Sequence, residues 1–136
     1  MPSSQSFKNQ HKELVDIVGK IAAMLQPATV TAKATDIRGL LTQLAGKVTM
    51  HLTMEDSTLY KAMLANPTTK PVAERFQREM GGIATAFKNY LAKYATPAAI
   101  SSNAAAFIAD TQGIAKALGD RIKREEAELY PAFEKI

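Results

Sequence analysis

Four apolar stripes, each built from steps of three and four residues, run through this 136-residue sequence. Proline-containing breaks separate them, and the stripes cover residues 7–25, 37–62, 72–94 and 100–133. Such steps place apolar side chains on one face of a helix, and no segment keeps the period of two that marks a strand. Short connections between long helices favour antiparallel neighbours. The sequence therefore predicts an all-α, up-down-up-down antiparallel four-helix bundle, with residues 1–136 forming one domain.

Composition excludes several classes of protein. The 17 basic and 13 acidic residues are scattered along the chain and give a net charge of +4, which gives little support to nucleic-acid binding. No apolar run approaches the roughly 20 residues that span a bilayer, and the polar N-terminus lacks the apolar region of a signal peptide. Without cysteines, the chain has neither disulfides nor thiolate metal ligands. We therefore expect a soluble cytoplasmic protein with no nucleic-acid or membrane partner.

The predicted topology brings a polar layer to one end of the bundle. The start of the first helix, the end of the second, the start of the third and the end of the fourth meet there. The residues at these places are His11, His51 with Glu55, Phe76 with Met80, and Arg121 with Glu125 or Glu126. Both histidines of the chain lie on apolar stripes. Because buried charged groups are costly unless they are paired or bound to metal, this layer needs a chemical explanation.

Two segments of the layer repeat one pattern, with a histidine in the first copy and an arginine in the second. They are His51-Leu-Thr-Met-Glu-Asp-Ser-Thr-Leu-Tyr60 and Arg121-Ile-Lys-Arg-Glu-Glu-Ala-Glu-Leu-Tyr130. Residues four apart share a helix face, and imidazole with carboxylate suits iron, manganese or zinc. The alternative is a pair of hydrogen-bonded core histidines. We expect Tyr60 and Tyr130 to cap the core with their hydroxyls at its wet edge, and Gly81-Gly82 to mark tight helix packing.

This pattern resembles the hemerythrin-like family, also called the HHE cation-binding domain, over nearly the whole chain. Its signposts are His11, His51-x-x-x-Glu55 and the ending Glu125-Glu126-x-x-Leu129-Tyr130-Pro131. The resemblance implies a four-helix bundle around a carboxylate-bridged di-iron site. It also implies that one iron is held by His11, His51, Glu55 and Glu126. Glu125 is the close rival of Glu126, because the sequence does not fix the rotation of the helix.

The ligands that the resemblance implies for the second iron are missing. Their places are taken by Phe76, Met80 and Arg121, so reversible di-iron oxygen binding is not expected. We hypothesise that the Arg121 guanidinium binds the former bridging carboxylates and supplies the lost positive charge. Three outcomes remain open. The layer holds one metal ion, or no metal and a buried salt-bridge cluster, or two ions with Glu79 as a substitute ligand.

The leading functional interpretation is a small hemerythrin-like metal-binding or sensory domain with one ion. Iron is the first choice of metal, with zinc or manganese as alternatives, and oxygen or nitric oxide is the expected small ligand. A metal-free bundle that serves as an interaction or signalling domain is the second interpretation. An enzyme comes third, because the sequence shows no substrate pocket or acid–base pair beyond the polar layer.

Overall fold

The computed structural model describes residues 2–136, apart from the side chain of Met80. Within that range the chain is all-helical and contains no strand, which confirms the all-α class. The long helices are α1 (Gln5–Ala22), α3 (Ala34–Met54), α5 (Lys70–Lys93) and α7 (Ala104–Arg124). The shorter helical segments are α2 (Pro27–Ala32), η1 (Glu55–Tyr60), α4 (Lys61–Leu64), α6 (Pro97–Ser101), η2 (Glu125–Leu129) and α8 (Tyr130–Glu134).

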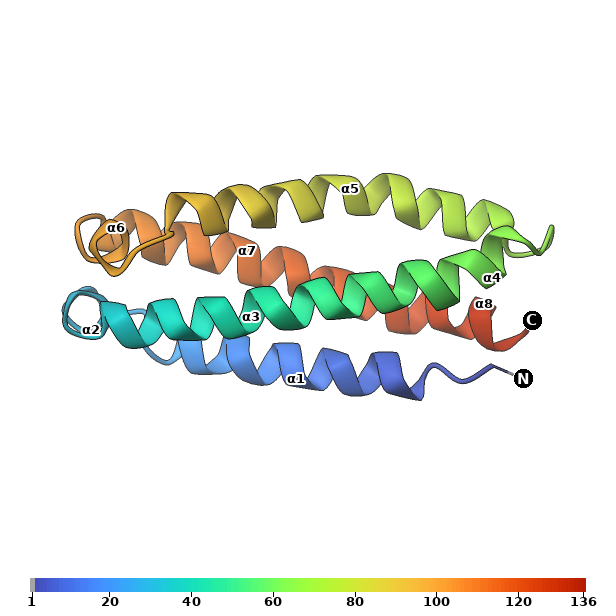
Figure 1. Ribbon diagram of the computed structural model, residues 1–136, viewed down its shortest axis with the longest axis horizontal. Coiled ribbons are helices and arrows are strands. Elements are labelled where there is room, and N and C mark those ends of the chain that lie inside the picture. The colour runs from blue at the N-terminus through green and yellow to red at the C-terminus, as the bar shows by residue number, and fades with distance from the viewer. Residues whose placement is uncertain (1) are drawn as a thin grey trace.

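The long helices run side by side along the length of the molecule (Figure 1). Both chain termini lie at one end, together with α4 and α8, whereas α2 and α6 form the turns at the other end. Prolines mark several helix starts: Pro97 is the first residue of α6, and Pro71 is the second residue of α5. Proline fits there because the first-turn N–H groups have no partner within the helix.

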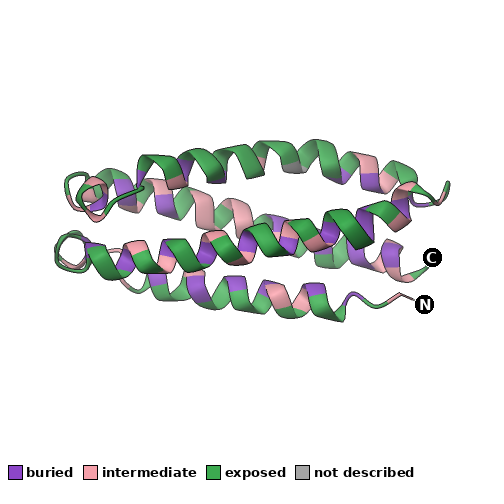
Figure 2. Ribbon diagram, in the orientation of Figure 1, coloured by how far each residue is buried: buried purple, intermediate pink, exposed green. Residues whose placement is uncertain are grey.

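Buried positions recur along the long helices (Figure 2). Their apolar side chains form two core clusters. The larger cluster extends from Leu14 and Val48 toward the α2 and α6 turns. The smaller one includes Phe7, Leu59 and Phe133 and lies near the termini. The predicted polar layer separates the two, and its buried polar members are His11, His51, Glu55, Arg121 and Glu125.

The second and fourth long helices each widen into a π-helical segment at the repeated motif. η1 begins at Glu55 and η2 begins at Glu125. In an α-helix of 3.6 residues per turn, a step of four residues drifts around the axis by about 40°. A π turn holds more residues per turn and so cancels this drift. As a result, the four-residue series from His51 to Met63 and from Arg121 to Phe133 stay buried, through Glu55, Leu59, Glu125 and Leu129.

Helix α5 packs least closely in its middle. Between the buried Phe76 and Phe87, every residue except Ile83 is exposed, apart from Met80, whose side chain lies outside the described residues. Among the described residues, a Cβ atom added at Gly81 or Gly82 meets no atom within 4 Å beyond its chain neighbours and the nearby backbone of α5 itself. The predicted tight helix packing at these glycines is therefore wrong, because their surroundings are open. The prediction that the Met80 side chain fills the polar layer stays a prediction.

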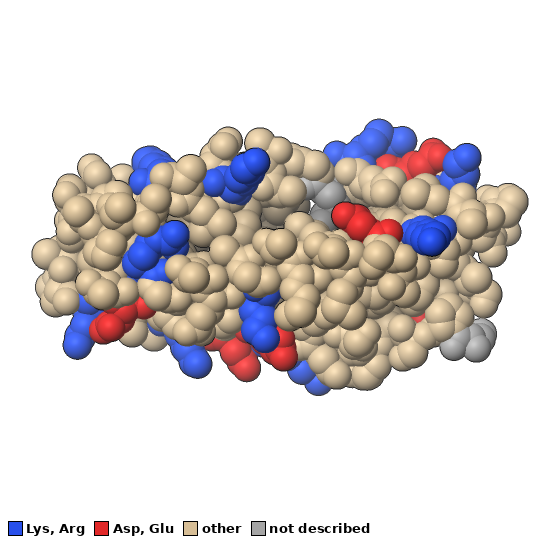
Figure 3. Space-filling view, viewed as in Figure 1, with Lys and Arg blue, Asp and Glu red and all other residues tan. Residues whose placement is uncertain are grey.

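The surface facing the viewer in Figure 3 carries lysine and arginine side chains that are spread over the molecule and interspersed with acidic ones. On that face they form no single basic stripe, as the scattered charges of the sequence indicate. Among residues 2–136, no helix has the length and apolar character needed to cross a bilayer.

Candidate metal centre

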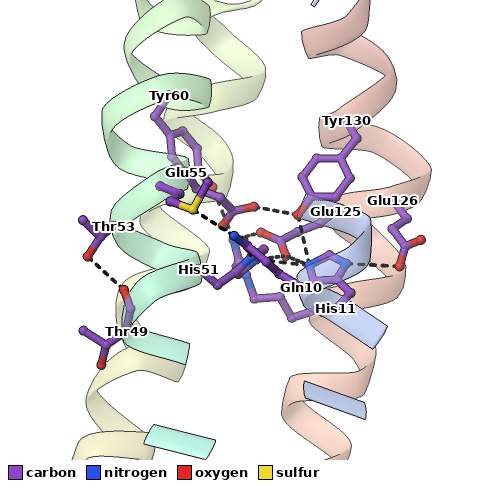
Figure 4. Close-up of polar contacts among 12 residues, drawn as sticks. Gln10, His11, Thr49, His51, Thr53, Glu55, Tyr60, Glu125, Glu126 and Tyr130 are labelled. Carbon is purple, nitrogen blue, oxygen red and sulfur yellow. Dashed lines mark hydrogen bonds and ion pairs between the residues drawn. The ribbon is translucent and has the colours of Figure 1, made fainter. Parts of the chain in front are cut away.

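Four buried side chains meet in the polar layer, and they come from three helices of the bundle, where α3 with η1 and α7 with η2 each count as one continuous helical rod. They are His11 from α1, His51 and Glu55 from the α3–η1 rod, and Glu125 at the start of η2. Each offers one potential ligand atom, and these atoms all lie within 4.8 Å of one another. His51 and Glu55 are four residues apart on one helix face, whereas His11 and Glu125 reach them only through the packing of the bundle (Figure 4).

Both imidazole rings point the same nitrogen toward the cluster. The Nε2 atoms of His11 and His51 lie 3.1 Å apart. On the outer side, His11 Nδ1 lies 3.1 Å from Glu126 Oε2, and His51 Nδ1 lies 2.7 Å from Gln10 Oε1. A neutral imidazole carries only one N–H. With Nδ1 as that donor, both Nε2 atoms present lone pairs to the same small space.

The two buried carboxylates show the same division between an inner and an outer oxygen atom. Glu55 Oε2 accepts a hydrogen bond of 2.7 Å from the Tyr130 hydroxyl, and Glu125 Oε2 lies 3.2 Å from Arg121 Nη2. Glu125 Oε1 lies 2.9 Å from His11 Nε2. Glu55 Oε1 is buried and has no hydrogen-bond partner among the described residues, although His51 Nε2 is 3.3 Å away.

This donor set fits a metal ion. Its four inner atoms are two imidazole nitrogens and two carboxylate oxygens, a mixture that suits iron, zinc or manganese. Buried polar atoms normally have hydrogen-bond partners. A cation bound between Glu55 Oε1 and the two facing Nε2 atoms would supply a partner for all three atoms. The outer atom of every candidate ligand is held by Gln10, Glu126, Tyr130 or Arg121, as the partners of metal ligands usually are.

The pKa values of the cluster show that it favours positive charge. Burial alone lowers the pKa of the His51 imidazole, but the carboxylates of Glu125 and Glu55 outweigh this effect and raise it to about 9. Burial alone raises the pKa of the Glu125 carboxyl, but hydrogen bonds from the histidines and the charge of Arg121 lower it to about 2. Burial raises the pKa of Glu55. In the metal-free protein at neutral pH, a proton on His51 therefore stands where an ion would bind.

Arg121 lies beside the cluster, with 7% of its side chain exposed. Its guanidinium pairs with Glu125 and donates from Nη2 to the Tyr60 hydroxyl at 3.3 Å. The guanidinium carbon lies 5.8 Å from the centre of the buried Phe76 ring. Arg121 therefore brings a positive charge to Glu125, one of the two carboxylates of the cluster, whereas Glu55 is held by Tyr130 instead.

The structure places the predicted site residues unequally. His11, His51, Glu55 and Glu125 come together. Glu126, which the resemblance placed ahead of Glu125, lies outside the group with 39% of its side chain exposed. Its carboxylate contacts the far side of the His11 ring instead. The reason is the α-helical step from Arg121 to Glu125, whose backbone N–H bonds to the Arg121 carbonyl. This step of four residues places Glu125, and not Glu126, on the buried face.

Other residues near the cluster differ from expectation. The predicted wet-edge position of the Tyr60 and Tyr130 hydroxyls is wrong, because both rings are buried and both hydroxyls contact the polar layer. The sequence signal for these contacts was that Tyr60 and Tyr130 occupy the same position in the two repeated motifs. Glu79 pairs with Arg124 on the surface, away from the ligand group, so the structure gives no support to a second ion held by Glu79. Gln10 had no such signal, because its contact spans 41 residues of sequence.

A small cavity of about 40 Å³ adjoins the cluster between the long helices. Its polar lining residues are His51, Arg121 and Glu125. Its other lining residues are apolar: Leu14, Val48, Leu52, Ile83, Ala84, Phe87, Leu118 and Ile122. The volume exceeds the roughly 10–15 Å³ that one water molecule requires, so a molecule of a few atoms fits beside the candidate ligands.

Comparison with known proteins gives one match. The model of the hemerythrin HHE cation-binding domain matches residues 3–133, which is nearly the whole chain and includes every residue of the cluster. No curated protein and no solved structure matches the chain. The chain therefore belongs to the hemerythrin HHE cation-binding domain family.

Proposed function

We propose that this chain is a hemerythrin-like domain that binds one metal ion on His11, His51, Glu55 and Glu125, within an up-down-up-down bundle of four long helices. The observation that carries the proposal is the inner face of the cluster. Two Nε2 atoms lie 3.1 Å apart there, and within the part of the chain that the structure describes the buried Glu55 Oε1 has no hydrogen-bond partner. Iron, zinc and manganese all suit this donor set. A bound iron would supply redox chemistry or small-ligand binding, whereas zinc would add charge and rigidity.

The role that best fits the surroundings is sensing rather than oxygen carriage. Arg121 and Phe76 take up space beside the cluster and offer no ligand to a second ion. The adjoining cavity of about 40 Å³ has room for a diatomic ligand such as oxygen or nitric oxide. In this sensing role, a single bound ion would bind the small ligand from the adjoining cavity.

Metal analysis of protein purified without a histidine tag tests the proposal. We expect close to one equivalent of iron, zinc or manganese, or uptake of one equivalent when the metal-free protein is titrated with Zn²⁺ or Fe²⁺. His51→Ala should abolish uptake. Glu128→Gln is the matched control, because Glu128 lies on the same helical rod as Glu125 but on the surface. Failure of the wild-type protein to take up any of these metals would refute the proposal.

A metal-free interaction or signalling domain is the second candidate function. The observation in its favour is the buried ion pair between Arg121 and Glu125, which already neutralises one carboxylate without an ion. Chelation separates the two functions. A native-state ligand adds its binding free energy to stability, so a chelator should lower the melting temperature of a metal-binding domain and leave that of a metal-free domain unchanged.

A further inference from the structure

Both nitrogens of the His11 ring lie next to a carboxylate. Nδ1 is 3.1 Å from Glu126 Oε2, and Nε2 is 2.9 Å from Glu125 Oε1. A neutral imidazole donates from only one nitrogen, so the two carboxylates compete for one proton. If the proton sits on Nε2, the ring donates to Glu125 and cannot bind an ion there. If it sits on Nδ1, Nε2 is left as a ligand. Glu126 therefore acts on the state of His11 without entering the cluster.

Gln10 has the corresponding position at His51. Its Oε1 accepts from His51 Nδ1 at 2.7 Å, and its Nε2 donates to the sulfur of Met54 at 2.9 Å. The second contact fixes which end of the amide faces the ring. Because Gln10 and His11 are adjacent on α1, the same helical turn supplies one candidate ligand and the residue that orients the other.

We propose that Glu126 and Gln10 are positioning residues that hold the Nδ1 protons of His11 and His51, and so keep both Nε2 atoms free to bind the metal ion. The inference rests on the proposed metal-binding function and assigns roles to two residues outside the ligand group. The physical basis is general: the second ring nitrogen of a metal-bound histidine almost always donates to an acceptor that fixes its tautomer.

The tautomer of His11 in the metal-free protein provides the first test. The chain has only two histidines, so long-range ¹H–¹⁵N correlation spectra show two imidazoles, which His11→Gln and His51→Gln spectra assign. In the wild-type protein we expect His11 to carry its proton on Nδ1. In Glu126→Leu the proton should move to Nε2, where Glu125 accepts it. Glu126→Gln keeps an acceptor oxygen and should restore the Nδ1–H form, and Glu128→Leu is the surface control.

Zinc affinity, measured by competition with a chromophoric chelator, provides the second test. Loss of the hydrogen-bond partner of a metal-bound histidine typically lowers metal affinity by roughly 10- to 100-fold. We expect losses of this size in Gln10→Leu and Glu126→Leu. The conservative variants Gln10→Glu and Glu126→Gln should retain most of the affinity, and Gln5→Leu, an exposed change on α1, should match wild type. Circular dichroism confirms that each variant is folded.

The outcomes separate this inference from the proposed function. The positioning roles are overturned if the His11 proton stays on Nδ1 in Glu126→Leu, or if zinc affinity is unchanged in both leucine variants. Either result counts even if the wild-type protein binds metal. Wild-type protein that binds no zinc, iron or manganese overturns the proposed function. The movement of the His11 proton in metal-free Glu126→Leu would still establish the role of Glu126.

Discussion

The Nε2 atoms of His11 and His51 lie 3.1 Å apart, and each ring has a hydrogen-bond acceptor outside the cluster within reach of its Nδ1. Two lone pairs at that distance repel unless a cation lies between them or one nitrogen is protonated. The carboxylates of Glu55 and Glu125 favour either solution. A proton and a metal ion therefore compete for one place.

The stability of the metal-free protein should fall between pH 6.5 and 9. The pKa of His51 is raised from 6.5 to about 9 in the folded chain, where Glu125 and Glu55 outweigh the opposing effect of burial. A raised pKa contributes stability that is complete below the unfolded value and is lost as pH rises through the folded value. The upper limit is about 3 kcal/mol. Urea unfolding in the presence of a chelator measures it, and His51→Gln should remove the step. A flat profile in the wild-type protein would contradict the proposed charge of His51.

Metal binding should release protons in the same pH range. At pH 7.5, below the folded pKa of about 9, the metal-free protein holds a proton on His51 that an ion must displace, since metal ligands bind deprotonated. Calorimetric zinc titrations in buffers of different ionisation enthalpy count the released protons. We expect release of close to one proton per ion at pH 7.5, and little release above pH 10. Equal release at both pH values would show that the proton is not on the metal-binding atoms.

Glu55→Gln should abolish metal binding without destabilising the metal-free fold. The amide keeps the volume of the side chain and an acceptor for Tyr130, but it removes the charge whose burial raises the pKa of Glu55. If the amide oxygen accepts from Tyr130, an NH₂ group stands at the place of Oε1, the proposed ligand atom. We expect a melting temperature equal to or above that of the metal-free wild type, together with loss of zinc uptake. Glu13→Gln, a half-exposed carboxylate on α1, is the control. Zinc affinity retained in Glu55→Gln would remove Glu55 from the ligand set.

Much of this arrangement follows from the sequence because the helical stripes are regular. The steps from Phe7 to Ile21 and from Ile37 to Val48 correctly indicate buried faces, and His11 and His51 fall on those faces. The choice between Glu125 and Glu126 did not follow, because the resemblance pointed to Glu126 and the sequence does not fix the rotation of the helix. The α-helical step of four residues from Arg121 brings Glu125 to the buried face instead. The partnership of Gln10 with His51 depends on how α1 and α3 pack, and no local pattern encodes it.

Removal of Arg121 should destabilise the metal-free protein far more than the metal-bound one. Arg121 Nη2 lies 3.2 Å from Glu125 Oε2, and both side chains are buried. Breaking one partner out of a buried ion pair typically costs about 3–5 kcal/mol, because the other charge is left uncompensated. We expect a loss of this size in metal-free Arg121→Leu. The double change Arg121→Leu with Glu125→Gln should recover much of it. Urea unfolding with and without zinc makes the comparison, and equal losses in both states would show that the ion does not share the charge of Glu125.

Replacement of Gly81 and Gly82 by alanine should stabilise the protein. Both glycines lie in the interior of α5, and both are exposed. An added Cβ meets no atom of the described residues within 4 Å, apart from its chain neighbours and the nearby helix backbone. Alanine is favoured over glycine in a helix interior by roughly 0.5–1 kcal/mol per residue, so the double variant should gain about 1–2 kcal/mol. Gly46→Ala, at a similarly open position in α3, is the control for the intrinsic preference. Thermal unfolding in the presence of a chelator measures both variants. A gain at Gly46 without one at Gly81 and Gly82 would show that the middle of α5 needs its glycines for a purpose other than helix stability.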